Sequence, residues 1–354
     1  MNKADQILNH LKIVELASVL AGPAVGQFFS ELGAEVIKVE NARTGGDVTR
    51  SWKLPSEDAG KEDSAYYRAV NWRKQVVALD LRKSKDRETV YALIDQADVV
   101  ISNFSPAKGK SLGVDGATLR ARNPRLIFAR LDAFGPKSDR PAYDIVLQAE
   151  TGFLSMSGTE AGELCRMPVA LIDILAAHQL KEGILLALLQ RAETGQGATV
   201  TTNLYASGLA SLANQATNYL IAGHIPQPMG VRHPNIAPYG DLFELANGVR
   251  IVLAVGSDRQ FEALCQMLGL ELHPDWETNA KRVMNRSKLI EKLGDMLKLW
   301  SWPDFERAAN RARIPFGRVR NMGEVFATAQ AQAQLLQYEN GDRSVRTVAF
   351  EISN

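Results

Sequence analysis

Asp173 stands where a short apolar segment meets a long apolar helical one. Residues 169–172 are apolar, and residues 174–191 predict a helix. An aspartate at such a junction commonly caps the helix by accepting backbone N–H bonds. The same position suits a nucleophile, because a helix N-terminus stabilises an anion and a well-positioned carboxylate can attack an electrophilic carbon. The residue pattern alone leaves both interpretations open.

Other common catalytic and metal-binding patterns are missing from the sequence. It contains no G-x-S-x-G, no H-E-x-x-H and no P-loop lysine motif. None of the five histidines has the spacing of a metal ligand; they are His10, His178, His224, His233 and His273. We therefore expect neither a metal site nor a serine hydrolase.

Composition and charge narrow the choice of partners and compartment. The 354 residues carry 41 basic and 40 acidic side chains, so no strong overall field attracts nucleic acid or an anionic membrane, and we expect neither as a partner. Cys165 and Cys265 form no Cys-x-x-Cys pair, which favours a reducing compartment. Residues 1–11 do not resemble a signal peptide, and apolar runs such as 183–189 are too short to span a bilayer. The expected location is the cytoplasm.

The first half of the chain alternates strand-like and helix-like segments. Strands are predicted at residues 12–17, 35–40, 75–81, 99–102 and 126–131. Helices are predicted between them, for example at 24–32 and 85–96. This alternation is typical of βαβ units, so we expect an α/β fold with a Rossmann-like parallel sheet.

The second half predicts a smaller α+β domain. Residues 223–238 hold four prolines and two glycines and read as a linker, and residues 239–257 predict an antiparallel unit with a turn at Asn247-Gly248. Amphipathic helices are predicted at 259–268, 287–300 and 303–312. The expected organisation is a large domain at 1–222, a linker at 223–238, a small domain at 239–326 and a segment at 327–354 that returns towards the large domain.

The N-terminal unit partly imitates a dinucleotide-binding fingerprint. A strand, a turn at Gly22-Pro23, a helix and a second strand ending at Glu40 have the right order. However, the turn reads Ala-Gly-Pro-Ala-Val-Gly and lacks the G-x-G-x-x-G that lets the backbone approach a pyrophosphate. NAD therefore remains a weaker alternative.

A series of short segments lies in a fixed order along nearly the whole chain. They are residues 14–16, 20–23, 32–40, 46–50, 77–81, 97–104, 123–127, 141–144, 194–197, 233–240, 260–269 and 314–319. In their residues and their order these segments resemble the family III CoA-transferases, the CaiB–BaiF group that includes formyl-CoA transferase.

The resemblance implies that Asp173 is the covalent nucleophile. Its carboxylate would attack a donor acyl-CoA to give a mixed anhydride, which the CoA thiolate would convert into an aspartyl-CoA thioester; the acceptor acid would then reverse these steps. No metal or redox cofactor is implied, since the CoA thioester is itself a substrate. The implied partners are an acyl-CoA, a carboxylic acid and a second copy of the chain in an interlocked homodimer.

The resemblance also implies a set of CoA-binding residues. Phe104 would offer a stacking face for adenine and Arg82 a charge for a phosphate. The full implied set is Val19, Leu20, Ala21, Leu79, Asp80, Leu81, Arg82, Asn103, Phe104, Ser105, Tyr143 and Asp144.

The sequence departs from formyl-CoA transferase at several positions. Asn41 and Ser111 replace arginines that hold CoA there, although Arg43 lies close to the first, and Lys108 and Lys110 lie close to the second. Leu20 replaces a polar residue near the oxalate, so we expect a less polar or differently held acid than oxalate. We also expect the chain, which ends at Asn354, to lack the family's closing helical segment.

Two other functions remain as alternatives. The related α-methylacyl-CoA racemases have a histidine where this chain has Tyr143, and a tyrosine is a poor general base near neutral pH. A catalytically silent acyl-CoA-binding protein is the other alternative, which the presence of Asp173 and Tyr143 disfavours.

Overall fold

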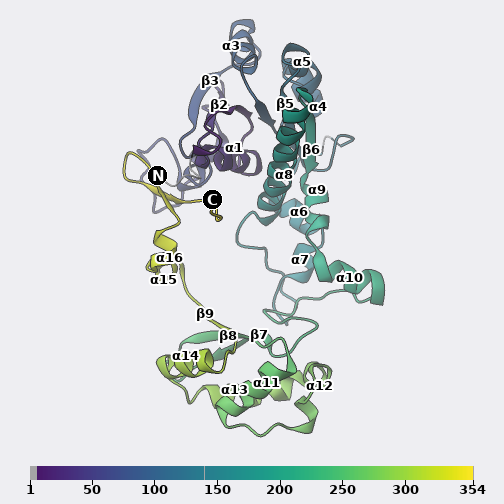
Figure 1. Ribbon diagram of the computed structural model, residues 1–354, viewed down its shortest axis with the longest axis vertical. Coiled ribbons are helices and arrows are strands. Elements are labelled where there is room, and N and C mark those ends of the chain that lie inside the picture. Colours follow the sequence, from purple (N-terminus) through teal and green to yellow (C-terminus); the bar gives the residue numbers. More distant parts are fainter. Residues whose placement is uncertain (1–5, 139, 354) are drawn as a thin grey trace. The chain divides into compact units, whose positions relative to one another are not determined.

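The computed structural model describes residues 6–138 and 140–353 and divides the chain into two units (Figure 1). The first unit comprises the residues up to Leu154, Arg166–Pro226 and the residues from Ala333 onwards. The second comprises Ser155–Cys165 and Gln227–Gln332. The segment Ser155–Cys165, which sequence analysis kept in the large domain, therefore belongs with the second unit.

A six-stranded parallel sheet forms the centre of the first unit, in the order β3-β2-β1-β4-β5-β6. The strands are β1 (Lys12–Leu16), β2 (Glu35–Asn41), β3 (Gln75–Leu79), β4 (Val99–Ser102), β5 (Ile127–Asp132) and β6 (Thr199–Asn203). The chain reverses its direction of winding between β1 and β4, which makes a topological switch point where ligands commonly bind. The expected α/β class is confirmed.

Alternating strand residues pack against helices on the two faces of this sheet. Ile13 and Ile101 lie in one core cluster, with helices α1 (Ala21–Glu31) and α8 (Leu171–Thr194). Their neighbours Val14 and Val100 lie in a second cluster on the opposite face. The helices there are α3 (Ser84–Ile94), α4 (Pro106–Leu112) and α5 (Gly116–Arg122). Because both faces are covered, the central strands are apolar on both sides.

Shorter elements surround this sheet. They are the 3₁₀ turn η2 (Val48–Ser51) and helices α2 (Ala65–Arg68), α6 (Asp144–Glu150), α7 (Phe153–Met156), α9 (Leu204–Ala210) and α10 (Ala213–Ala222).

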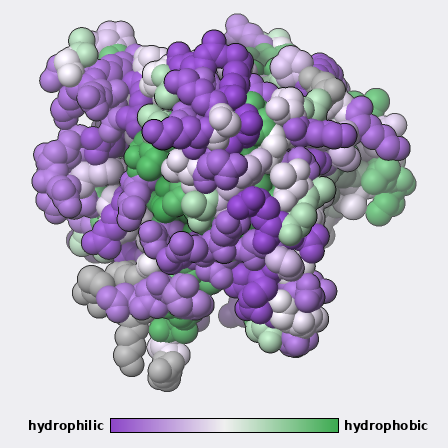
Figure 2. All heavy atoms as spheres, turned by 90° about the horizontal axis from the view of Figure 1, so that it is seen from above, coloured by the Kyte–Doolittle hydropathy of each residue, from purple (hydrophilic) through white to green (hydrophobic). Residues whose placement is uncertain are grey.

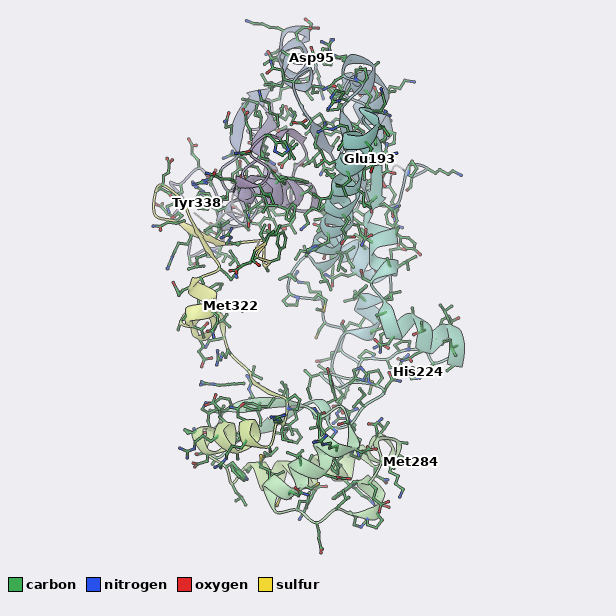
Figure 3. All side chains as sticks on the ribbon, in the orientation of Figure 1. Asp95, Glu193, His224, Met284, Met322 and Tyr338 are labelled. Atoms are coloured by element: carbon green, nitrogen blue, oxygen red, sulfur yellow. The ribbon has the colours of Figure 1, made fainter. Side chains whose placement is uncertain are left out.

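The C-terminal segment packs on the first unit through a small hairpin of β10 (Leu335–Gln337) and β11 (Arg343–Val345). Tyr338, labelled in Figure 3, donates a hydrogen bond to the Arg68 carbonyl at 2.5 Å. Further on, the N–H groups of Thr347 and Val348 both donate to Glu31 of α1, and Val348 is buried in the core. The last part of the chain thus completes the first unit.

The second unit is built on a three-stranded antiparallel sheet, which confirms the expected α+β arrangement. Its strands, in the order β7-β8-β9, are β7 (Tyr239–Glu244), β8 (Arg250–Ala254) and β9 (Phe316–Arg318). Ile251, Phe261 and Phe305 are among its fully buried core residues. The helices are α11 (Asp258–Leu268), η3 (Pro274–Trp276), α12 (Asn279–Met284), α13 (Arg286–Leu297), α14 (Trp302–Arg311), α15 (Met322–Phe326) and α16 (Ala329–Gln332).

Hydrophilic side chains cover most of the face shown in Figure 2, with small hydrophobic areas between them. Within residues 6–138 and 140–353, no helix is both long and apolar enough to cross a membrane.

Candidate active site

A pocket of about 650 Å³ opens at the carboxyl ends of β1, β4 and β5, beside the switch point. It brings together seven of the residues that the resemblance implied: Val19, Leu20, Ala21, Asn103, Ser105, Tyr143 and Asp173. The same edge of the sheet supplies Ser18 and Asp132, which the sequence analysis did not name. Asp132 ends β5, so the rule that ligands bind beyond the carboxyl ends of parallel strands would have pointed to it.

Asp173 lies in the first turn of α8 and is not its cap. The helix begins at Leu171, and Ala170 at the cap position makes no side-chain hydrogen bond. Instead, one carboxylate oxygen of Asp144 accepts the N–H groups of Ile172 (2.7 Å) and Asp173 (3.2 Å). The capping role considered for Asp173 therefore belongs to Asp144, whose other oxygen is held by Gln148 at 2.6 Å.

The Asp173 carboxylate is buried without a partner of opposite charge. Only 8% of the residue is exposed, and no hydrogen bond or ion pair to its side chain is found among the described residues. Burial, and then the negative charge of Asp144, raise the pKa of Asp173 to about 7. The positive end of α8 does not reverse this shift, because Asp144 already occupies the N–H groups of residues 172 and 173. Near neutral pH the group therefore exists in both protonation states.

Trp52 packs between two tyrosines of this site: Tyr143, which lines the pocket, and Tyr66, on which the charge of Asp173 acts. The ring of Trp52 is 5.1 Å from that of Tyr66 and 6.2 Å from that of Tyr143, measured between centroids. Burial, followed by the charges of Asp173 and Asp144, raises the pKa of Tyr66 to about 12, so its hydroxyl stays protonated. Sequence reasoning missed Trp52 and Tyr66, and no motif marks them.

The turn between β1 and α1 forms another wall of the pocket. The Ser18 N–H donates to the Asn103 side chain at 3.3 Å, and the Asn103 amide donates back to the Ser18 carbonyl at 2.9 Å. This pair of bonds joins β1 to β4 across the switch point. Further along the same turn, the backbone N–H groups of Leu20 and Ala21 have no hydrogen-bond acceptor among the described residues.

Asp132 is a second acidic group on the pocket. Its Oδ1 accepts the Gly135 N–H at 2.5 Å, and a nitrogen of Arg130 lies 3.4 Å from its Oδ2. Burial raises the pKa of Asp132 above its ordinary value, which the hydrogen bond and Arg130 only partly offset. Arg140 supplies a positive charge to the same pocket wall and pairs with Glu150.

Five more of the implied CoA contacts lie around a smaller pocket of about 80 Å³ at the ends of β2 and β3, whereas the implied contact Asp144 lines neither pocket and is buried against α8. The smaller pocket is lined by Leu79, Asp80, Leu81, Arg82 and Phe104, together with Asn41 and Lys108. Two of the implied residues have structural partners: Asp80 accepts the Arg82 N–H at 3.1 Å, and Leu81 is buried in the core. Lys108 lines this pocket, whereas Arg43 does not.

The part of the chain that the structure describes contains no group of three or more His, Cys, Asp or Glu residues able to hold a metal ion. The pocket around Asp173 presents carboxylates, backbone N–H groups and aromatic rings, a set suited to acyl chemistry.

Comparison with known proteins identifies the family of this chain. The sequence profile of CoA-transferase family III matches residues 8–353. The succinate–glutarate CoA-transferase of Agrobacterium fabrum is 36% identical over 341 residues, covering 94% of this chain and 84% of that protein. The human succinyl-CoA:glutarate CoA-transferase is 33% identical over 329 residues, covering 91% and 74%.

A crystal structure of a CAIB/BAIF family protein from Brucella suis superposes with a TM-score of 0.85 at 36% identity, covering 99% of this chain and 93% of that one. These matches and the shared fold confirm the resemblance found in the sequence. The chain belongs to CoA-transferase family III and is an enzyme of the CoA-transferase class.

Proposed function

We propose that this enzyme transfers CoA from an acyl-CoA to a free carboxylic acid through covalent intermediates on Asp173. The observation that carries the proposal is a buried carboxylate without a counter-charge, lying on the wall of a pocket at the switch point. Such a carboxylate is weakly solvated and therefore more nucleophilic than an exposed one.

The first half-reaction moves CoA onto the enzyme. The ionised Asp173 attacks the thioester carbonyl, the C–S bond breaks and CoA leaves as a thiolate, which gives a mixed anhydride. The thiolate then attacks the Asp173 carbonyl carbon and expels the donor acid, which carries away one oxygen of Asp173. The product is an aspartyl-CoA thioester.

The second half-reaction reverses these steps with the acceptor acid. The acceptor carboxylate attacks the Asp173 carbonyl carbon and displaces the CoA thiolate, forming a second anhydride. The thiolate then attacks the acceptor acyl carbon, and Asp173 is released with one oxygen that came from the acceptor. Each tetrahedral intermediate requires hydrogen-bond donors, and the N–H groups of Leu20 and Ala21 are suitable candidates because they have no other acceptor in the described residues.

We propose succinyl-CoA as the donor and a dicarboxylic acid of about the size of glutarate as the acceptor. Support comes from the relatives, which are named for succinate or succinyl-CoA with glutarate and, in Haloarcula hispanica, for succinyl-CoA with mesaconate. A second carboxylate on the substrate needs a positive charge near the pocket. Arg140 lies on the pocket wall, and the charge of Arg166 acts on Tyr66 beside Asp173.

We also propose a homodimer that works in the cytoplasm. Large apolar side chains are exposed on two helices of the first unit: Leu186 and Leu189 on α8, and Leu220 and Ile221 on α10, all at least 66% exposed. Surfaces of this kind are typical of protein contacts, and a second copy is the partner that the family resemblance implies. Cys165 and Cys265 are free thiols, which suits a reducing compartment.

Isotope transfer tests the covalent mechanism directly. The enzyme is mixed with succinyl-CoA and glutarate labelled with ¹⁸O in both carboxylates, and the peptide containing Asp173 is analysed by mass spectrometry after one turnover. We expect one ¹⁸O atom in Asp173, together with glutaryl-CoA as product. Asp58, which is exposed on the same unit, serves as the unlabelled internal control. Glutaryl-CoA formation without label in Asp173 would refute the mechanism but leave the transfer activity standing.

A further inference from the structure

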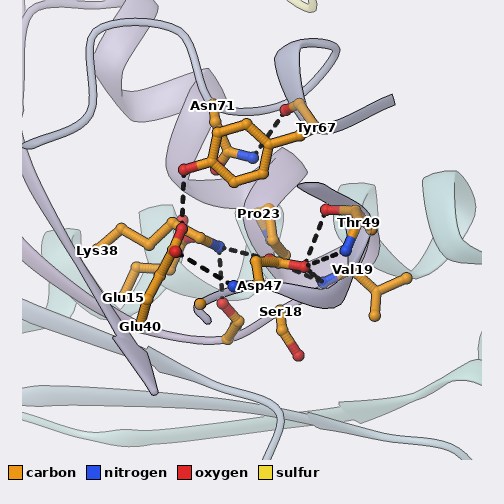
Figure 4. Close-up of polar contacts among 12 residues, drawn as sticks. Glu15, Ser18, Val19, Pro23, Lys38, Glu40, Asp47, Thr49, Tyr67 and Asn71 are labelled. Atoms are coloured by element: carbon orange, nitrogen blue, oxygen red, sulfur yellow. Dashed lines mark hydrogen bonds and ion pairs between the residues drawn. The ribbon is translucent and has the colours of Figure 1, made fainter. Parts of the chain in front are cut away.

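Four charged side chains form a buried chain beneath the pocket, in the order Lys74, Glu15, Lys38 and Asp47 (Figure 4 shows its inner part). The Nζ–O distances are 2.7 Å from Lys74 to Glu15, 2.9 Å from Glu15 to Lys38 and 3.0 Å from Lys38 to Asp47, and all four side chains are fully buried. Burying charges is expensive even when they are paired. The proposed acyl transfer uses none of them, so the network needs another explanation.

The last member of this chain, Asp47, reaches the backbone of the turn that lines the pocket. The N–H of Val19 points at the Asp47 carboxylate, 3.2 Å from one oxygen and 3.4 Å from the other. Val19 has a φ of 73°, a left-handed conformation that is unfavourable for a β-branched residue. An acceptor for its N–H is one of the few interactions that can hold such a conformation in place.

The Asp47 carboxylate is itself fixed from several sides. It accepts the N–H (3.1 Å) and hydroxyl (2.8 Å) of Thr49, and the backbone N–H of Asp47 donates to the Glu40 carboxylate at 3.1 Å. Lys38 also donates to the Ala17 carbonyl at 2.9 Å, at the start of the same turn. The ion network therefore holds the turn by two hydrogen bonds, one to the Ala17 carbonyl and one from the Val19 N–H.

We propose that Asp47, held by Lys38, is a positioning residue that keeps the Val19 backbone in its left-handed conformation. The N–H groups of Leu20 and Ala21 then face the pocket that contains Asp173. The inference rests on the proposed function, since the turn serves the acyl transfer. Loss of the Asp47 carboxylate should reduce kcat through misplacement of these donors. CoA binding should change less, because the implied contacts Leu79, Arg82 and Phe104 lie at the second pocket, away from this turn.

A double-mutant cycle tests this assignment. Asp47→Asn keeps the size of the side chain but removes one acceptor oxygen, and we expect kcat to fall about tenfold with little change in the KM for acyl-CoA. Val19→Gly is the second arm, because glycine adopts a positive φ without strain. In the Val19→Gly background the kcat loss caused by Asp47→Asn should shrink to about threefold or less. Val19→Gly alone is the reference for the double variant.

Each outcome decides the matter. An unchanged kcat in Asp47→Asn overturns the proposal, and so does an equal kcat loss in the wild-type and Val19→Gly backgrounds, which would mean that the ion pair acts only on stability. If Asp47→Asn does not fold, Thr49→Val replaces it, since this change weakens the Asp47 site without leaving Lys38 unpaired; a smaller loss, again reduced by glycine, is then expected.

Hydrogen exchange separates this inference from the proposed function. Even if no acid accepted CoA, deuterium uptake by the peptide containing residues 18–20 would be faster in Asp47→Asn than in the wild type. Unchanged uptake there would overturn the positioning role, whatever the activity.

Discussion

Two buried aspartates in the first unit, Asp173 and Asp47, show how surroundings give one residue type two different properties. Burial by itself raises the pKa of both. At Asp47 the charge of Lys38 and the hydrogen bonds of Thr49 outweigh burial, so its pKa lies below the ordinary value. At Asp173 the one charged neighbour among the described residues that shifts the pKa is Asp144, which adds to burial and brings the pKa to about 7. The compensated carboxylate is inert and holds structure, whereas the uncompensated one is suited to react.

The largest expected effect comes from removing the reactive carboxylate. Asp173→Asn should lower the rate of CoA exchange by about a thousandfold or more, because an amide in place of the carboxylate cannot form the covalent intermediates. Asp47→Asn should lower this rate only about tenfold. Initial rates of glutaryl-CoA formation measure both. If Asp173→Asn reduced the rate less than Asp47→Asn does, the assignment of Asp173 as the reactive carboxylate and Asp47 as the structural one would be wrong.

The same substitution should stabilise the protein. The folded-state pKa of Asp173 lies above its unfolded value, so wild-type stability falls as pH rises from about 4 to about 7 and stays low above that. The asparagine side chain carries no charge, so Asp173→Asn should be more stable by roughly 2–4 kcal/mol at pH 8, with the difference vanishing near pH 4. Urea unfolding at the two pH values measures this, with Asp58→Asn as an exposed control. A variant less stable than wild type at pH 8 would contradict the uncompensated burial of Asp173.

The dependence of kcat/KM on pH should also distinguish Asp173 from Asp47. Since the ionised form of Asp173 attacks, kcat/KM should rise with pH to a plateau above about 7 and fall roughly tenfold for each unit below. Asp47, with its lowered pKa, should contribute no inflection in this range. A flat profile between pH 5 and 8 would mean that Asp173 is already ionised at pH 5.

The smallest effect concerns the neighbour that caps α8. Asp144→Asn removes a negative charge but keeps an oxygen for the N–H groups of Ile172 and Asp173. The acid limb of the kcat/KM profile should therefore move to lower pH, by less than the shift that burial causes, because burial is the larger contribution. Asp144→Ala, which also removes the cap, should instead reduce stability. No movement of the limb would assign the raised pKa to burial alone.

The fold could be predicted well from the sequence because its signals are local. Apolar segments that alternate with amphipathic ones gave the parallel sheet, and Asn247-Gly248 marked a turn where Gly248 indeed has a positive φ. The segment Ser155–Cys165 could not be assigned to the second unit, because no change in composition sets it apart from its neighbours.

The site was predictable only in part. Residue pattern alone left Asp173 as either a cap or a nucleophile, and the competing cap turned out to come from Asp144, 29 positions earlier in the chain. Asp47 lies in a segment that matches the family, yet its contact with Val19 spans 28 positions and has no local signature. Long-range contacts of this kind arise from the packing of βα units, and neither spacing nor periodicity reveals them.

The order of the two units along the chain has a consequence for biosynthesis. The first unit receives Val348 in its core, and Thr347 and Val348 donate hydrogen bonds to Glu31. The residues that make these contacts follow Gln227–Gln332 in the chain. The ribosome must therefore synthesise this part of the second unit before the core of the first unit can be completed. Through most of translation, the surface of α1 that later receives Val348 therefore stays uncovered, and this is the stage at which a nascent chain would most need a chaperone.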